Sequence, residues 1–217
     1  LSYSIKLKVN SMAQSHTQSP ISPDEALQRL MDGNKRFLQG FDAPDSFQYQ
    51  DLRIRHEQHP YACILGCADS RVSPEHAFDE SHGNLFVARV AGNMVTPEIL
   101  ASLEYGTSVL GASLIMVLGH SGCGAVHASI DSVSKQAKFE GHIDHLLKSL
   151  EPAILDARHA HPGTWMEQAV MQNVRRNVQI LSQSEPVLAG LVRGGKLKVV
   201  GGVYHLENGQ ISLLDEN

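Results

Sequence analysis

The sequence predicts an α/β protein with a mostly parallel central sheet, an antiparallel edge strand, flanking helices and an N-terminal helical arm. Four short apolar runs alternate with longer segments in which apolar residues recur at helical spacing. The runs are residues 61–66, 85–90, 113–118 and 197–203. Runs of this length separated by helices are typical of βαβ units and parallel sheets. The dipeptide Asn208-Gly209 predicts a hairpin after the fourth run, so residues 211–214 should return antiparallel beside it.

Length and charge exclude several classes of protein. The chain has 217 residues, enough for one substantial core or a core with a short arm. Its 18 Lys and Arg residues against 23 Asp and Glu residues give a net charge of −5, so a nucleic-acid partner is not expected. The longest apolar runs, such as 114–118, are far shorter than the roughly 18 residues that a membrane-spanning helix needs. We therefore expect a soluble protein with no membrane partner.

The cysteine count indicates the compartment. Three cysteines in this length cannot form a disulfide framework. An odd count suits a reducing compartment, in which thiols serve as metal ligands or as small buried hydrophobes. A cytoplasmic location is the default expectation, with an organelle or the periplasm left open.

Composition divides the chain into three parts. Residues 1–18 include a stretch rich in Ser, Gln and His around Met12 and are expected to be vector-derived, processed or disordered. Residues 19–60 are expected to form the amphipathic helical arm, which needs another surface to lie on. Residues 61–217 carry all the apolar runs and should form one α/β domain, which is expected to hold the functional site.

The arm opens with a clear helix signal. Ser22, Pro23 and Glu25 combine an N-cap serine, a proline in the first helical position and the glutamate of a capping box. Gly40 should end this helix, and a second short helix is expected over 47–56. The predicted apolar face of the first helix comprises Leu27, Leu30, Met31, Asn34 and Leu38.

Helices are also expected between the strands of the domain. Thr96 should cap a helix that has Pro97 in its first position, and Gly111 should end it. The other expected helices cover residues 123–133, 142–157 and 165–182.

Two of the predicted strands end in potential metal ligands. The run 61–66 leads into Cys67, and the run that begins at residue 113 leads into His120 and Cys123. Ligands and catalytic groups gather outside the carboxyl ends of parallel strands, so both motifs should meet at one edge of the sheet. Two thiolates and one imidazole are good zinc ligands of the kind that leaves a fourth tetrahedral position open.

Each motif is weak when it is taken alone. A cysteine at the end of a strand is more often a small buried hydrophobe than a ligand, and this interpretation holds for Cys63 inside the first run. The combination is more specific, because Cys67 is followed by Asp69 and Arg71, and Cys123 lies in a glycine-rich turn that leads into a helix. The N-terminus of that helix favours a thiolate.

These segments resemble a known family. CADSRV at 67–72 and GHSGCGAV at 119–126 are similar to the two signature segments of the β-class carbonic anhydrases. FVARVAGN at 86–93 and SLEYG at 102–106 fit the same family. The resemblance extends from about residue 24 to residue 214. It implies reversible hydration of carbon dioxide to bicarbonate and a proton through a zinc-bound hydroxide, with Zn²⁺ held by Cys67, His120 and Cys123.

The resemblance also implies roles for other residues. Asp69 and Arg71 would form a dyad beside the metal. The residues that would line the substrate pocket are Gln58, Phe86, Ala91, Tyr105 and Gly124. Without the resemblance, Phe86 and Tyr105 would be interpreted as core aromatics. Family members build the site at a dimer interface and commonly pair dimers, so a homodimer or a dimer of dimers is expected, with the partner chain as the surface for the arm.

The residues themselves support this chemistry. Zinc with two thiolates is formally neutral and should acidify water less than a cationic three-histidine site does, so a helper group is needed. Asp69 can accept a hydrogen bond from the attacking oxygen, and the planar fork of Arg71 can hold the carboxylate in a bidentate pair. Two alternatives stay open. One is the same chemistry on carbon disulfide or carbonyl sulfide, and the other is a non-catalytic zinc or redox-sensing module.

Overall fold

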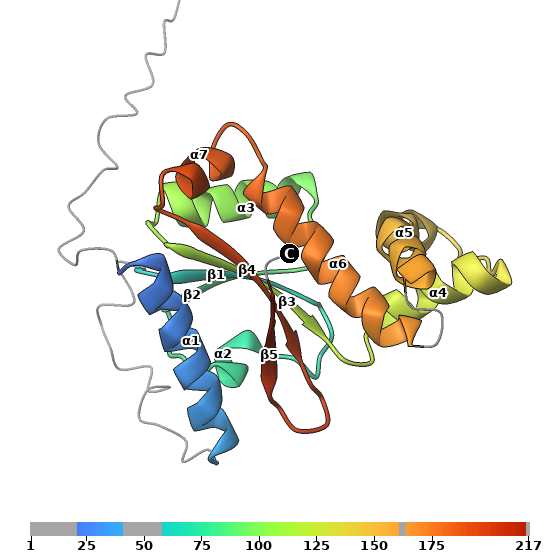
Figure 1. Cartoon of the computed structure of the whole chain (residues 1–217), viewed down its shortest axis with the longest axis horizontal. Coiled ribbons are helices and arrows are strands. Elements are labelled where there is room, and N and C mark those ends of the chain that lie inside the picture. The colour runs from blue at the N-terminus through green and yellow to red at the C-terminus, as the bar shows by residue number, and fades with distance from the viewer. Residues whose placement is uncertain (1–20, 41–57, 161–163, 216–217) are drawn as a thin grey trace, which may run out of the picture.

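The computed structural model describes residues 21–40, 58–160 and 164–215, and its centre is a five-stranded sheet (Figure 1). The strands are β1 Ala62–Gly66, β2 Leu85–Arg89, β3 Leu114–His120, β4 Lys198–Tyr204 and β5 Ile211–Leu214. Their order is β2-β1-β3-β4-β5, with all neighbours parallel except the antiparallel pair β4 and β5. The predicted fold class is confirmed, and each predicted strand is present with ends shifted by no more than two residues.

Helices cover the sheet and extend beyond it. They are α1 Pro23–Leu38, α2 Pro74–Ala77, α3 Pro97–Ser108, α4 Gly124–Lys135, α5 His142–Ala160, α6 Trp165–Ser182 and α7 Leu188–Arg193. The helices α2 and α7 were not predicted, because four and six residues are too few for a periodic apolar pattern. The helix predicted over 47–56 lies outside the described residues. None of the described helices combines the length and the apolarity needed to cross a membrane.

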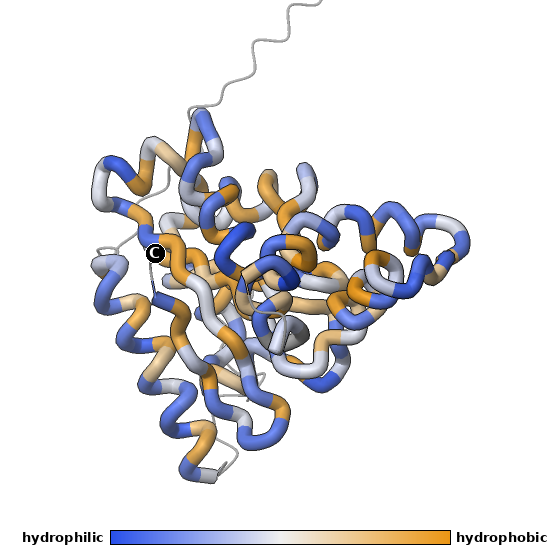
Figure 2. Tube along the Cα trace, turned by 45° about the vertical axis from the view of Figure 1, so that its right-hand side comes forward, coloured by the Kyte–Doolittle hydropathy of each residue, from blue (hydrophilic) through white to orange (hydrophobic). Residues whose placement is uncertain are grey.

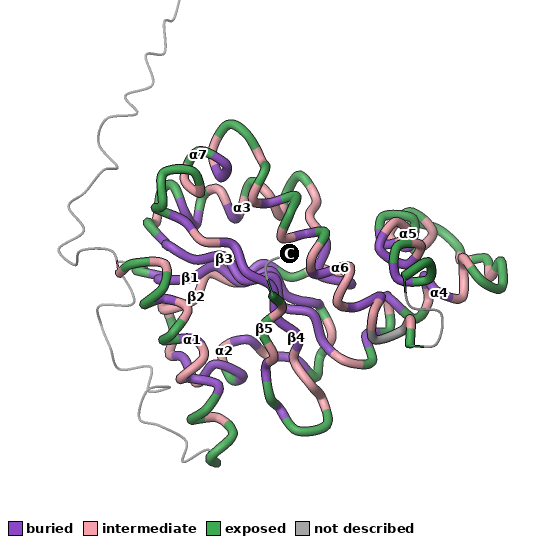
Figure 3. The backbone as a smooth tube through the Cα atoms, in the orientation of Figure 1, coloured by how far each residue is buried: buried purple, intermediate pink, exposed green. Residues whose placement is uncertain are grey.

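The helices form one layer on each face of the sheet (Figures 1 and 3). The helices α3, α6 and α7 cover one face, whose buried cluster includes Leu65 and Val117. The helices α1 and α2 cover the other face, whose cluster includes Ile64 and Met116. Because neighbouring strand residues point to opposite layers, β1 and β3 are buried along their whole length. These strands therefore have continuous apolar sequences, and Figure 2 shows the apolar residues concentrated in the interior.

The first helix begins as predicted, and its predicted face is buried except at Leu38, with Leu27 and Met31 half-buried against the core cluster. Ser22 Oγ accepts from the Glu25 amide at 3.3 Å, and the Glu25 carboxylate accepts from the Ser22 amide at 2.9 Å, which confirms the capping box. The buried residues are Ala26, Leu30, Gly33 and Asn34. Leu38, which was predicted to be on this face, is 45% exposed. The difference arises because a Cβ atom at Gly33 would collide with the carbonyl group of Phe78, so α1 turns its small residues towards α2.

The buried carboxylate of Glu80 anchors α1 against the sheet of its own chain. Glu80 is 3% exposed and accepts hydrogen bonds from Arg29 Nε at 2.9 Å and Arg29 Nη2 at 2.8 Å. It also accepts from the Tyr61 hydroxyl and from Asn84 Nδ2, each at 2.7 Å. The Arg29 guanidinium lies 4.1 Å from the centre of the Tyr61 ring. The inner side of the arm's first helix therefore lies on its own sheet.

Candidate metal centre

The predicted metal ligands meet at one edge of the sheet. Cys67 directly follows β1, His120 ends β3 and Cys123 caps the N-terminus of α4. Because β1 and β3 are parallel neighbours, with Gly66 opposite Leu118, both strands deliver their ligands to the same side. The donor atoms of the three residues all lie within 4.8 Å of one another, and the two sulfurs are 3.9 Å apart.

These residues fit a metal ion. All three ligand side chains are buried, and His120 is fully inaccessible. His120 Nδ1 lies 2.9 Å from the Ser121 carbonyl oxygen, and because a carbonyl oxygen only accepts, Nδ1 carries the proton. His120 Nε2 is therefore a lone-pair acceptor, and it is buried with no hydrogen-bond partner. A metal ion would satisfy this atom, and two thiolates with one imidazole are a donor set typical of zinc.

The two ligand thiols are electrostatically linked. The hydrogen bond with the Cys123 thiol lowers the pKa of Cys67, and the Gly92 amide, which lies 3.4 Å from the Cys67 sulfur, acts in the same direction. The same interaction raises the pKa of Cys123, although the first amides of α4 oppose the rise. Binding of a metal ion by both sulfurs as thiolates would release the thiol proton of this hydrogen bond. Cys63 differs, because burial raises the pKa of its thiol to about 12. It is not one of the clustered metal-ligand residues, as expected for a strand residue.

The acid next to the ligands is held by the arginine that was predicted to hold it. Asp69 Oδ1 accepts from the Arg71 amide and from Arg71 Nε, both at 3.0 Å, and Oδ2 accepts from Arg71 Nη2 at 2.8 Å. The hydrogen bond from the Arg71 side chain holds the pKa of Asp69 well below its usual value. Asp69 Oδ2 lies 3.8 Å from His120 Nε2, the nitrogen that faces the metal position. Arg71 also donates to the Gly122 carbonyl at 3.3 Å, which connects the two ligand loops.

Sequence reasoning missed Arg89, at the end of β2. Its side chain donates to the carbonyl oxygens of Cys67, Asp69 and Val72 at 2.8, 2.7 and 2.8 Å. One arginine thereby ties together the loop that carries both a ligand and the acid. The available signal was an arginine that follows the apolar residues 85–88 at the end of a predicted strand.

The hairpin after β4 supports the histidine ligand. Ser121 Oγ accepts from the Leu206 amide at 2.9 Å and lies 3.1 and 3.2 Å from the two Glu207 carboxylate oxygens, to which it donates. The Ser121 amide donates to the Tyr204 carbonyl at 2.9 Å. Ser121, whose carbonyl orients the His120 ring, is therefore held by three neighbouring residues at the end of β4 and in its hairpin.

Two of the five predicted pocket residues lie beside the metal ligands. Ala91 precedes Gly92, whose amide lies 3.4 Å from Cys67 Sγ. Gly124 follows Cys123 and opens α4.

The other three predicted pocket residues lie at the opposite end of the strands within this chain. Phe86 pairs with Cys63, four residues before Cys67, which corresponds to about 13 Å along the strand. The Tyr105 ring lies 6.2 Å from that of Phe86, and Gln58 precedes the start of β1. Tyr105 is 47% exposed, so it is not the core aromatic that its residue type alone suggested.

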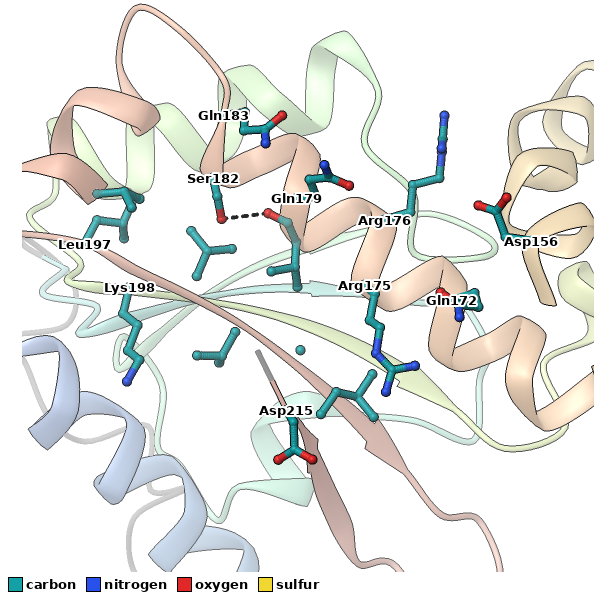
Figure 4. A pocket seen from close by; sticks show the side chains of 16 residues that line it. Asp156, Gln172, Arg175, Arg176, Gln179, Ser182, Gln183, Leu197, Lys198 and Asp215 are labelled. Carbon is teal, nitrogen blue, oxygen red and sulfur yellow. Dashed lines mark hydrogen bonds between the residues drawn. The ribbon is translucent and has the colours of Figure 1, made fainter. Parts of the chain in front are cut away.

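A groove of about 730 Å³ lies between α6 and the strands β4 and β5 (Figure 4). Its lining includes Arg175, Lys198 and Asp215, and it contains none of the predicted site residues. Lys198 opens β4 and pairs with Leu114, whereas His120 lies at the other end of β3. The groove is thus separate from the metal centre.

Comparison with known proteins agrees with the geometry. Residues 62–211 match the protein family described as carbonic anhydrase. The chain is 34% identical over 196 residues to carbonic anhydrase 2 of Mycobacterium tuberculosis, which covers 89% of this chain and 94% of that protein. It is 33% identical over 196 residues to a carbonic anhydrase of Pseudomonas aeruginosa, which covers 86% of each.

Solved structures show the same fold. The β-carbonic anhydrase CcaA superposes with a TM-score of 0.68 at 29% identity, which covers 87% of this chain and 95% of that one. The Coccomyxa β-carbonic anhydrase in complex with acetazolamide gives a TM-score of 0.68 at 27% identity, covering 88% and 86%.

Proposed function

We propose, from the premise that this chain belongs to the β-class carbonic anhydrase family, that it catalyses the reversible hydration of carbon dioxide to bicarbonate and a proton with a zinc ion as cofactor. The observation that carries the proposal is the meeting of Cys67, His120 and Cys123, three buried donors from two strand ends and one helix start. Three protein ligands leave a fourth tetrahedral position for chemistry, whereas a structural site uses four.

The metal and the acid would have separate tasks. A bound zinc ion supplies a Lewis acid that makes water a nucleophile near neutral pH. Asp69 orients the attacking water by accepting its hydrogen bond, because the lone pairs that do not face Arg71 remain available on the metal side. Arg71 keeps the carboxylate ionised and fixed in direction, and its bond to the Gly122 carbonyl keeps the dyad next to the second ligand loop.

The substrate pocket is proposed to combine residues of two chains. Ala91 and Gly124 lie next to the metal ligands of their own chain, and small side chains there leave room for a linear, apolar molecule. Gln58, Phe86 and Tyr105 lie at the opposite end of the strands, and Gln58 and Tyr105 are exposed. We propose that these three residues line the pocket of a second copy, in a homodimer or a dimer of dimers. The three unpaired thiols agree with the cytoplasmic location that we propose.

The test measures carbon dioxide hydration by stopped flow together with metal content. The full-length protein should contain about one zinc per chain and hydrate carbon dioxide. Cys67→Ser and His120→Ala should lose both metal and activity. Cys63→Ala is the matched control, since it removes an equally buried cysteine that is not a ligand, and it should keep both. The proposal would be contradicted by activity only towards carbon disulfide or carbonyl sulfide. It would also be contradicted by a protein that holds one metal ion per chain but does not hydrate carbon dioxide.

A further inference from the structure

The loop after β2 contacts a metal-ligand sulfur through its backbone. The Gly92 amide lies 3.4 Å from Cys67 Sγ and points at it. Gly92 has φ +80°, and a Cβ atom at this position would lie 2.9 Å from Leu150 Cδ1 of α5. Residue 92 is therefore confined between the sulfur on one side and α5 on the other. Asn93, the next residue, is 2% exposed and also has a positive φ, of 40°.

Two buried asparagines of α6 hold this loop. Asn173 Nδ2 donates to the Gly92 carbonyl at 2.7 Å, and Asn177 Oδ1 accepts from the Val95 amide at 2.7 Å. The two side chains lie on one face of the helix, four residues apart, and Asn177 Nδ2 donates to Asn173 Oδ1 at 3.1 Å. This last bond fixes which end of the Asn173 amide faces Gly92, because its oxygen is already used.

Packing alone does not account for asparagine at these positions. Asn173 and Asn177 are 3% and 4% exposed, and their neighbours on the buried face of α6 include Val170, Val174 and Leu181. Asparagine is a poor helix former, and burying its amide costs free energy unless every polar atom is bonded. What the asparagines provide here is a fixed position for the loop, and Gly92 is the residue of that loop that contacts a ligand.

We infer that Asn173 is a positioning residue of the metal centre, acting through the Gly92 amide on the Cys67 sulfur. Asn173 and Cys67 hold the carbonyl and the amide of the same residue, so the Asn173 bond determines how well the amide is aimed. A hydrogen bond to a ligand sulfur withdraws charge from it and leaves the metal a stronger Lewis acid. This inference rests on the proposed function, and it adds a residue of α6 to the groups that tune the reaction.

The test is Asn173→Leu in the full-length protein, which keeps the size of the side chain and removes its donor. Zinc affinity should fall by about tenfold in competition with a chelator. In the cobalt-substituted protein, the sulfur-to-cobalt charge-transfer absorption should move to longer wavelength, because a sulfur that lacks its hydrogen bond releases charge more easily. Ser129→Ala is the matched control. It removes an equally buried hydrogen bond, from Ser129 Oγ to the Leu147 carbonyl at 3.0 Å, which involves neither Gly92 nor the two asparagines.

An unchanged absorption band in Asn173→Leu, or an equal shift in Ser129→Ala, would overturn the inference whatever happens to the affinity. Should Asn173→Leu fail to fold, Asn173→Asp takes its place, since it keeps the acceptor for Asn177 and replaces only the donor. The two proposals fail separately. A wild-type protein that binds cobalt with the expected band but does not hydrate carbon dioxide contradicts the proposed function alone.

Discussion

The replacement Asn34→Leu should destabilise the protein by disconnecting α1 from the hairpin between β4 and β5. Asn34 is 2% exposed, and its Nδ2 donates to the carbonyl oxygens of Ala77 at 2.9 Å and Gly209 at 3.0 Å. Its Oδ1 accepts from the Ile211 amide at 2.9 Å. One side chain therefore satisfies three buried backbone groups on two separate elements. Leucine has a similar volume but satisfies none of them.

The magnitude follows from the groups left unbonded. A buried backbone group without a partner costs about 1–3 kcal/mol. The Ile211 amide has a single hydrogen to donate, whereas each carbonyl oxygen has a second lone pair, so we take about 2 kcal/mol for the amide and about 1 for each carbonyl. The gain from a buried leucine side chain offsets part of this sum. A net loss of about 2–3 kcal/mol is expected.

Urea denaturation followed by circular dichroism measures the loss, with wild type and variant at the same protein concentration because the stability of the proposed dimer would depend on it. Gln28→Leu is the control, since it places the same leucine on the exposed side of α1 and should change stability by no more than about 0.5 kcal/mol. A loss below about 1 kcal/mol for Asn34→Leu, or an equal loss for both variants, would refute the reasoning from unbonded groups.

Three further predictions concern the dyad and the contacts of α1. Arg71→Lys keeps the charge but removes the pair of side-chain nitrogens that bind Asp69. The value of kcat/KM for carbon dioxide should therefore fall at least about tenfold in stopped flow, while the urea midpoint stays unchanged. Wild-type activity would show that the two-nitrogen contact is dispensable. Gly33→Ala forces a methyl group into the Phe78 carbonyl and should lower stability by about 1–3 kcal/mol by urea denaturation, and an unchanged midpoint would mean that α1 shifts freely. In Glu80→Gln an amide nitrogen replaces one carboxylate oxygen and cannot accept the hydrogen bonds that reach Glu80. The expected loss of stability is about 2–3 kcal/mol, and it is not larger because the Arg29 side chain is half-exposed. A cost of less than about 1 kcal/mol in the same assay would place this network among ordinary surface ion pairs.

The strands and the ligand set could be predicted because local sequence determines them. The runs that form β1 and β3 are apolar throughout, since the sheet is covered on both faces, and each run ends directly in a potential ligand. Parallel neighbours deliver their ends to one edge, so adjacency and direction were enough to bring Cys67 to His120 and Cys123. The capping signals of Ser22 and Thr96 are equally local, and the side-chain oxygen of each residue accepts the expected hydrogen bond from a backbone amide.

The contacts that hold the ligands could not be predicted, because they join elements far apart in the chain. Asn173 reaches Gly92 across 81 residues, and Ser121 reaches Glu207 across 86. Each depends on how α6 or the last hairpin packs, and no spacing in the sequence encodes that. On α1, Leu38 was predicted to be buried and Gly33 was not, for the same reason, since the close approach to α2 and not hydrophobic periodicity selected Gly33 for burial.

The support of the metal centre comes from three layers of the fold at once. The Cys67 carbonyl accepts a hydrogen bond from Arg89 of β2, and its sulfur contacts Gly92, which α6 holds. Cys123 is positioned as the N-cap of α4. His120 is oriented by the Ser121 carbonyl, which the last hairpin holds, and α1 in turn pins that hairpin. Donors that are held in this way before the metal arrives need little rearrangement to bind it, which favours a single geometry. It follows that substitutions in α1 or α6, far from the reacting atoms, should alter the metal centre before they unfold the chain.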